Sequence, residues 1–323
     1  MTENQEQPRR RRRVVVRAAL AFLLVFVVGW GATQALVQKA EEDHPPLGDF
    51  IEAGGIRHHY VDSGSGPPIV FVHGAFGALQ DFTATVTPEL STRYRCIAWD
   101  RPGHGYSERP DGRIDPGVQA ELLVDFVRAL ELDEPPLLVG FSYGGAVVLT
   151  AGMKEPDATR GLVLLNGPSH PWPDPIDFQY RFPTIPLVGP LLVETVLMPL
   201  GVALSSSSVE QAFAPLPVEE LFLERSPISL SLRPDSYRAN AEDIRSLKPF
   251  LARQSQRYEE LSVPLTLVVS EGDLVVGPKI HSVPLSEAVP HFRMTRIDPA
   301  GHQILYTHPE IVIRAVDDSM RGE

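Results

Sequence analysis

A serine with a glycine two positions away on each side stands where a strand-like apolar run ends and a helix-like segment begins. Residues 140–144 read GFSYG, with Ser142 at the centre; the apolar run 136–140 leads into them, and small and apolar residues continue to 154. A sharp turn from strand to helix strains its central residue, needs small neighbours such as Gly140 and Gly144, and projects the hydroxyl near the positive helix end. We predict that Ser142 is a nucleophile. A glycine-rich turn that happens to contain serine is the alternative.

A nucleophilic serine needs a base, and the base needs an acid that orients it. Asp273 ends the segment SEGD after the strand pattern 264–269, and His302 ends PAGH after the strand pattern 292–297. Both residues therefore follow strands, in the chain order serine, acid, histidine. We predict Asp273 as the acid and His302 as the base. Glu271 is the alternative acid, and a turn aspartate and a helix-capping histidine are the structural interpretations.

Acyl transfer also requires two N–H donors directed at the developing oxyanion. One donor should be the backbone N–H of Tyr143, which follows the nucleophile. The segment HGAFG at 73–77 comes directly after the strand pattern 68–72 and should supply the other. Ala75 is the first choice and Phe76 the second. His73 and Gly74 are predicted to shape this loop, with catalysis by the histidine as the alternative.

A second segment contains an acid, a base and a serine within eight residues. Residues 100–107 read DRPGHGYS after the strand pattern 95–99. We predict a structural role, because two glycines favour a tight turn and Asp100 and Arg101 can hydrogen-bond the backbone. Catalysis by His104 is the alternative.

Alternating strand and helix patterns must position these residues. Buried parallel strands appear as short apolar runs, and helices as apolar residues recurring three or four positions apart. The alternation predicts a mostly parallel, doubly wound sheet. It stops after 167, and 168–245 is rich in proline and leucine, which predicts an inserted helical cap. The further patterns are a hairpin at 50–61, a strand at 161–165, and helices at 79–90, 115–132, 143–154 and 309–320.

The N-terminus carries a separate signal. The net charge of the chain is −12, yet its first 35 residues contain six arginines against two glutamates. Residues 18–38 contain no charge, and about 20 helical residues span the ~30 Å core of a bilayer. By the positive-inside rule, arginines before this segment keep the N-terminus in the cytoplasm. We predict a signal anchor in a bacterial-type cytoplasmic membrane with the following domain exported. A peptide cleaved near Ala35, giving a secreted protein, is the alternative.

These patterns divide the chain. We expect a cytoplasmic basic segment at 1–17, a transmembrane helix at 18–38, a linker at 39–49, a catalytic core at 50–167 and 246–323, and a cap at 168–245. The acidic remainder argues against a nucleic-acid partner. The single cysteine, Cys96, lies in an apolar run and is expected to be buried and inert.

Together the motifs resemble those of the α/β-hydrolase superfamily, in its capped branch with a serine nucleophile. The resemblance rests on HGAFG, DRPGHGYS, GFSYGG, EGD and AGH, and it covers about 50–320. It implies the α/β-hydrolase fold. Epoxide hydrolases and haloalkane dehalogenases of this type carry aspartate at the position of Ser142, so the resemblance disfavours their alkyl-ester chemistry here. The family's other acid position holds Asn166, which favours Asp273.

The expected activity is hydrolysis of small-molecule carboxylic esters through an acyl-serine intermediate. This chemistry needs neither a metal nor an organic cofactor. Residues 182–200 hold a single charge, Glu194, which favours apolar acyl groups or a surface facing the bilayer. Another serine-triad reaction is the alternative: carbon–carbon-bond or amide hydrolysis, perhydrolysis or acyl transfer. A non-catalytic binding protein on the same fold is the third interpretation.

Overall fold

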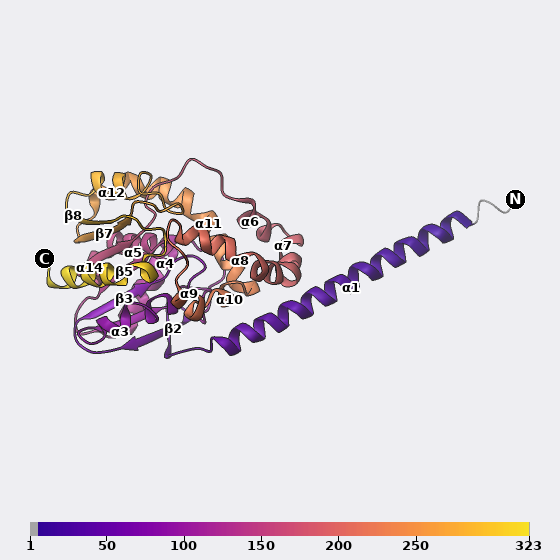
Figure 1. The fold of residues 1–323 in the computed structure, drawn as a ribbon, viewed down its shortest axis with the longest axis horizontal. Helices are drawn as coiled ribbons and strands as arrows, with labels where there is room; N and C mark the ends of the chain where they lie inside the picture. The colour runs from indigo at the N-terminus through magenta and orange to yellow at the C-terminus, as the bar shows by residue number, and fades with distance from the viewer. Residues whose placement is uncertain (1–5, 323) are drawn as a thin grey trace.

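One eight-stranded sheet organises the protein (Figure 1). The computed structural model describes residues 6–322, with side chains from Arg11 onward. The strand order is β1-β2-β4-β3-β5-β6-β7-β8; β2 pairs antiparallel with both β1 and β4, and the remaining pairs, from β4 to β8, are parallel. The prediction of a mostly parallel sheet is confirmed. The strands are β1 Asp49–Ala53, β2 Ile56–Ser63, β3 Pro68–Val72, β4 Arg95–Trp99, β5 Leu137–Phe141, β6 Gly161–Leu165, β7 Leu265–Ser270 and β8 Phe292–Ile297.

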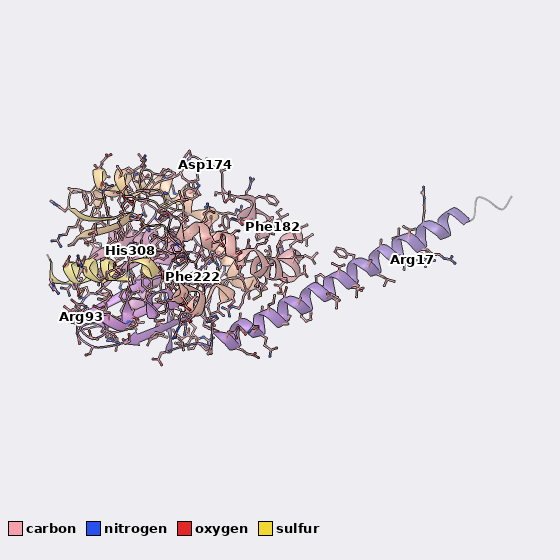
Figure 2. The ribbon with its side chains drawn as sticks, in the orientation of Figure 1. Arg17, Arg93, Asp174, Phe182, Phe222 and His308 are labelled. Carbon is pink, nitrogen blue, oxygen red and sulfur yellow. The ribbon has the colours of Figure 1, made fainter. Side chains whose placement is uncertain are left out.

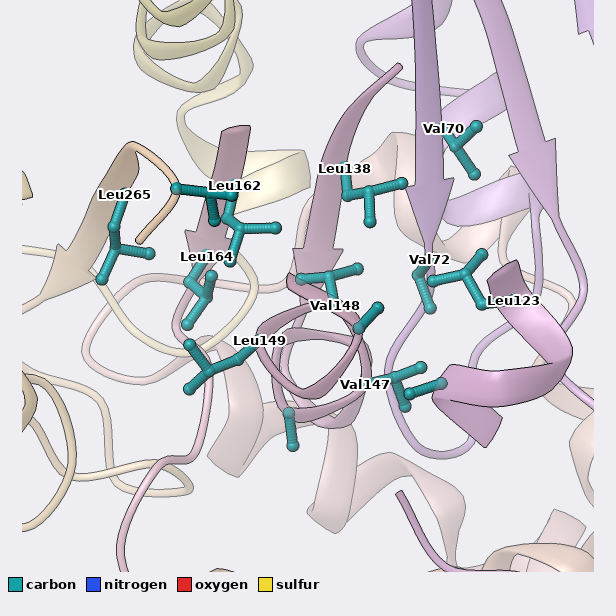
Figure 3. Packing of buried hydrophobic residues seen from close by; sticks show 14 of the residues in the cluster. Val70, Val72, Leu123, Leu138, Val147, Val148, Leu149, Leu162, Leu164 and Leu265 are labelled. Atoms are coloured by element: carbon teal, nitrogen blue, oxygen red, sulfur yellow. The ribbon is translucent and has the colours of Figure 1, made fainter. Parts of the chain in front are cut away.

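Alternate residues of each central strand enter two separate cores, because successive side chains point to opposite faces of a sheet. In β3, Val70 and Val72 join the core on one face, while Ile69 and Phe71 join the core on the other. Figure 3 shows the first of these cores, where Val147 packs beside Val72. Burying each such side chain stabilises the fold by about 1.5–3 kcal/mol.

Helices cover both faces of this sheet. α4 and α5 pack in the core that contains Val70, and α14 packs in the core that contains Phe71. Asp115 caps α4 by accepting hydrogen bonds from the N–H groups of Gly117 and Val118. The helices of the core are α2 Gln80–Thr83, α3 Thr87–Leu90, α4 Pro116–Ala129, α5 Tyr143–Lys154, η1 Pro156–Ala158, α12 Ser282–Ala288, α13 Ile304–Thr307 and α14 Pro309–Arg321.

The segment between β6 and β7 is helical throughout its described elements and forms a cap (Figure 1). The boundary that we placed between 245 and 246 lies inside α11, which continues to Gln254. The first half of α11 contacts the loops that follow β3 and β4. The second half of α11 packs in the core through Leu247 and Leu251. The elements are α6 Phe178–Arg181, η2 Phe182–Thr184, α7 Val188–Leu192, the π-helix η3 Val193–Leu197, α8 Met198–Phe213, α9 Glu220–Arg225, α10 Ile228–Ser231, α11 Pro234–Gln254 and η4 Ser255–Glu260.

A long helix, α1 (Glu6–Asp43), precedes the sheet. It continues through residues 39–43, which we expected in a linker, because Ala40 is buried on the cap and Lys39 pairs with Asp43 one turn later. Residues 1–5 of the predicted basic segment lie outside the described residues. Within residues 11–322, two helical stretches are long and apolar enough to cross a membrane, Arg11–Asp43 and Val188–Phe213.

Candidate active site

Ser142 occupies a sharp turn between β5 and α5. Its backbone has φ 50° and ψ −124°, a strained conformation for a residue with a side chain. The turn is tight because other backbone atoms crowd it. A Cβ on Gly140 would lie 2.4 Å from the Gly144 carbonyl oxygen, and one on Gly144 would lie 2.1 Å from the Val72 carbonyl oxygen. Ser142 therefore stands at the N-terminus of α5, as the glycine pattern predicted.

Asp273 and His302 meet although 29 residues separate them. His302 Nδ1 lies 2.7 Å from Asp273 Oδ2, with both side chains buried. The other carboxylate oxygen, Oδ1, accepts from the N–H groups of Val275 and Val276 at 2.7 and 2.8 Å. An ionised carboxylate only accepts, so this contact suits an imidazole with its proton on Nδ1, the tautomer in which Nε2 can accept a proton.

The imidazole lies beside the serine turn. Its ring centre is 5.1 Å from that of Phe141, the residue before Ser142. Within residues 11–322, no hydrogen bond joins the serine hydroxyl to His302. Such contacts often tighten only in the complex with substrate, so activation of the serine stays a prediction.

Neighbouring groups fix the loop that carries His302. Asn166, at the end of β6, donates from Nδ2 to the His302 carbonyl and to Ser270 Oγ, both at 3.0 Å. The alternative acid, Glu271, instead pairs with Arg296 at the surface. The histidine is therefore oriented by Asp273, and Asn166 supports its backbone.

The two proposed loop donors differ in what they contact. The Phe76 N–H donates to Asn240 Oδ1 at 2.7 Å and is already engaged. Within residues 11–322, the Ala75 N–H has no hydrogen-bond partner, which leaves it free for an oxyanion. Asn240 is a residue of α11 in the cap, and sequence reasoning missed it. The available signal was an asparagine and an aspartate three residues apart on a helix that also has an apolar side, Asn240 and Asp243.

A buried ionic cluster joins the cap to the loops. Asp243 accepts from Arg101 Nη1 at 2.7 Å, His104 Nε2 at 3.0 Å and Arg109 Nη2 at 3.0 Å. Burial opposes ionisation, but the His104 hydrogen bond and the two guanidinium groups outweigh it and lower the pKa of Asp243. Burial, assisted by Arg101, lowers the pKa of His104 to about 4, so this imidazole is neutral at pH 7. His104 is therefore occupied in the cluster.

The other predicted neighbours brace residues 73–77, the predicted oxyanion loop. His73 Nε2 accepts from the Arg101 N–H at 3.0 Å, and Arg101 also donates to the carbonyls of His73 and Gly74. Burial, followed by the charge of Arg101, holds the pKa of His73 well below its usual value. Asp100 accepts from the Leu79 N–H and from His59. These contacts are structural.

The cap also reaches the histidine loop directly. The carbonyl of Ala212, near the end of α8, accepts from the N–H groups of His302 and Gln303 at 2.8 and 3.2 Å. Thus α11 holds the oxyanion loop and α8 holds the loop of the predicted base. Within the described residues, no cluster of three or more acidic, histidine or cysteine side chains could hold a metal ion.

Fold and site together define a class of protein. Residues 67–309 match the family described as alpha/beta hydrolase fold, and the chain belongs to this family. The resemblance of the motifs to the α/β-hydrolase superfamily is thereby confirmed.

Relatives within the family catalyse different reactions. The chain is 36% identical to 2-hydroxymuconate semialdehyde hydrolase of a Pseudomonas strain over 149 residues, 45% of this chain and 52% of that protein. It is 29% identical to 2-hydroxy-6-oxo-2,4-heptadienoate hydrolase of Pseudomonas putida, covering 86% of this chain and 97% of that protein. Haloalkane dehalogenase 2 of Mycobacterium tuberculosis is 28% identical, and the match covers 80% of this chain and 90% of that protein. The chain thus spans about half of the first of these relatives and nearly all of the second.

Solved structures share the fold at lower identity. An enol-lactonase from Burkholderia xenovorans matches with a TM-score of 0.68 and 19% identity, covering 84% of this chain and 100% of that chain. A bacterial membrane phospholipase A matches with a TM-score of 0.64 and 18% identity, covering 98% of each chain. The fold match with the phospholipase A structure therefore includes α1.

Proposed function

We propose that this protein is a serine hydrolase that cleaves carboxylic esters and is held at a membrane by α1. The observation that carries the proposal is the contact between Asp273 and His302 beside the strained turn of Ser142. In this mechanism His302 Nε2 takes the hydroxyl proton while Ser142 Oγ attacks the ester carbonyl. The N–H groups of Tyr143 and Ala75 stabilise the oxyanion.

In the steps that follow, His302 acts first as an acid and then again as a base. Protonated His302 donates its proton to the leaving alcohol, and the carbonyl remains bound to Ser142 as an acyl ester. His302 then takes a proton from water, which attacks this ester. As the acid is released, protonated His302 returns that proton to Ser142 Oγ, which restores the free enzyme. Asp273 stays ionised throughout and stabilises the imidazolium.

Carbon–carbon-bond hydrolysis is the second candidate, because the relative covered almost completely is named for a dienoate. An anionic substrate of that kind needs a cation to bind its carboxylate. The buried cation beside the oxyanion loop is Arg101, whose donors face Gln119, Asp243 and two backbone carbonyls. Aromatic cap residues, Tyr180 and Tyr237, pack on Phe76 of the loop instead. These surroundings favour an uncharged, apolar acyl group.

Haloalkane dehalogenation is disfavoured despite the similarity to a dehalogenase. Ser142 stands at the nucleophile position, where the resemblance places aspartate in such enzymes. A serine forms an acyl ester with a carbonyl compound and cannot supply a carboxylate for alkyl transfer.

The part of α1 that packs against the cap supports retention of the anchor. Cleavage near Ala35 would remove Gly29 and Thr33, which lie against the cap. Thr33 is fully buried, and a Cβ on Gly29 would meet the Thr195 carbonyl oxygen at 2.7 Å. We propose the orientation of a single-pass anchor with the catalytic domain exported, because arginines precede the apolar segment.

A fluorophosphonate probe tests the nucleophile without knowledge of the substrate. The full chain in detergent should be labelled on Ser142, and Ser142→Ala should abolish the label. Equal labelling of the two proteins, or none of either, would contradict the serine mechanism. Circular dichroism of both proteins serves as the control for folding.

A substrate panel then separates the candidate reactions. It should contain p-nitrophenyl esters from butyrate to palmitate, a phosphatidylcholine, a p-nitroanilide and a 2-hydroxy-6-oxo-dienoate. We expect ester cleavage that is retained or increased for longer acyl chains. Faster cleavage of the dienoate would establish the second candidate, and rates falling steadily beyond butyrate would contradict an apolar acyl site.

A further inference from the structure

The last third of α1 packs against the cap. Gly29, Thr33, Val37 and Ala40 recur every three or four residues and therefore share one side of the helix. Thr33 and Ala40 are buried, and Gly29 allows the close approach to Thr195 in η3. Because these residues lie on one rigid helix, the anchor fixes the position of the cap.

Polar contacts lock the end of the same helix. Glu41 accepts from Arg233 Nη1 at 2.8 Å, and the Tyr106 hydroxyl donates to the His44 carbonyl at 2.6 Å. Arg233 immediately precedes α11. The helix is thus held by the cap and by the loop that follows β4, and it does not act as a loose tether.

Between residues 18 and 30, the part of α1 that leaves the body is apolar on every side. Phe22, Leu23, Leu24 and Val25 are consecutive and all exposed, and successive residues of a helix lie 100° apart. The free stretch from 14 to 30 rises about 26 Å, close to the ~30 Å hydrocarbon thickness of a bilayer. Its one charged residue, Arg17, lies near the outer end, from which a long side chain can reach the headgroups. If a bilayer holds this stretch, the bilayer surface lies near Gly29, the residue at which α1 first contacts the cap. The segment in the bilayer then ends near residue 30 and not at residue 38 as the sequence predicted, because Thr33 and Ala40 are buried against the cap.

An apolar ridge on the cap starts beside this point. Val196, Leu200 and Leu204 recur every four residues along η3 and α8, and Leu204 is 59% exposed. Leu187 is 89% exposed just before α7, and Leu191 is exposed four residues later. These five residues are called the cap ridge.

The surroundings of the cap ridge are nearly free of charge. Between 185 and 209 the only charged residue is Glu194, and its carboxylate is paired with Arg238. Figure 1 shows that α1 leaves the body at the end formed by α7 and α8, and in Figure 2 Phe182 lies at this end while Arg17 lies far out on α1.

We propose that the cap ridge lies in the headgroup region of a phospholipid bilayer, on the side where α1 leaves the membrane. The inference rests on the proposed anchoring by α1. Cap and anchor then bind the membrane as one unit, with the apolar side chains a few ångströms below the surface. Since α8 also contacts the His302 backbone through Ala212, the helix that touches lipid is the helix that borders the predicted active site.

A bilayer fits these surfaces better than a second copy of the chain. A protein partner covers one side of a helix, whereas residues 22–25 of α1 are apolar all round. The cap ridge begins beside Thr195, which contacts Gly29 of α1, and the helices that carry it lie at the end of the body where α1 leaves (Figure 1). One apolar environment of bilayer thickness covers both.

Fluorescent labels at single introduced cysteines test this placement in the full chain. Leu187→Cys and Leu200→Cys report the cap ridge, and Phe22→Cys reports the anchor. Phe292→Cys is the matched control, an exposed apolar position on β8, which lies away from the cap in Figure 1. The natural cysteine does not interfere, because Cys96 is buried and burial raises the pKa of its thiol to about 12.

Each variant carries an environment-sensitive dye in vesicles of phosphatidylcholine and phosphatidylglycerol. A fraction of the lipid bears a nitroxide quencher, either near the headgroup or deep in the acyl chain. We expect the labels at 187 and 200 to lose most of their emission to the shallow quencher. The label at 22 should respond to the deep quencher, and the label at 292 to neither.

The outcomes separate anchoring from docking. Quenching at 22 without quenching at 187 and 200 would overturn the docking and leave the anchor standing. No quenching at 22 would overturn the anchoring and the docking with it. Equal quenching at 292 would indicate general adsorption. Blue-shifted but unquenched labels at 187 and 200, with energy transfer that rises with protein density, would place a second copy on the ridge. Either of the last two results also overturns the proposal.

Discussion

Replacing Asp273 with asparagine should disable the proposed base while the fold stays intact. The Val275 and Val276 N–H groups both point at Oδ1, so the amide oxygen of Asp273→Asn must occupy that position. The amide NH₂ then faces His302 Nδ1, where the carboxylate oxygen stood. Two donors cannot face each other, so the imidazole must move its proton to Nε2. In that tautomer His302 cannot accept the proton of Ser142.

The expected loss follows from this change of tautomer. An orienting carboxylate replaced by its amide lowers the rate by about 10⁴-fold, equivalent to about 5.5 kcal/mol of transition-state stabilisation. The free energy of unfolding should change by less than about 1 kcal/mol, because the two hydrogen bonds to Oδ1 are kept.

The rate of fluorophosphonate labelling measures this loss without a known substrate, and the substrate found in the panel gives kcat. Glu271→Gln is the matched control, because it removes a nearby carboxylate whose partner is Arg296 at the surface. It should leave the rate unchanged. If Asp273→Asn kept more than about a tenth of the wild-type rate, or if Glu271→Gln were equally slow, the assignment of the acid would be wrong.

Three further outcomes are expected. Asn240→Ala should slow labelling and destabilise the fold by about 1–3 kcal/mol in urea, because the Phe76 N–H loses its acceptor, while Asn240→Asp should recover most of the labelling rate. Asp243→Asn should cost about 3–5 kcal/mol at pH 7.5 by leaving Arg101 buried without a counter-charge. Because the folded-state pKa of Asp243 is lowered, this difference should shrink below about pH 4. For His104, whose pKa is lowered to about 4, the stabilising contribution is present above about pH 6.5 and is lost towards pH 4, so the urea midpoint of the wild type should fall across that range.

Much of the site could be predicted from local sequence. A strand followed by glycine, serine and a helix determines the turn at Ser142, since the steric constraint lies within a few residues. Asp273 and His302 could be predicted because parallel strands bring their carboxyl ends to one edge of the sheet. The contact of 2.7 Å between them agrees with that reasoning, although their catalytic roles stay predictions.

Contacts between the cap and the loops could not be read from the sequence. Asn240 and Asp243 are polar residues of an amphipathic helix, and a solvent-exposed face was the ordinary interpretation. Their partners, Phe76 and Arg101, lie more than 100 residues away. The direction in which α11 crosses the sheet decides these pairs, and burial of Leu247 and Leu251 in the core sets that direction.

The N-terminal helix illustrates the same division. Its apolar stretch and its flanking arginines are properties of consecutive residues, so the sequence by itself determined that this segment could cross a membrane. Only the tertiary structure decided that the helix continues to Asp43 and packs Gly29 and Thr33 on the cap. The physical reason is that the hydropathy of a segment is a sum over consecutive residues, whereas packing depends on which surfaces meet in the folded chain. No pattern in the sequence pairs residue 29 with residue 195.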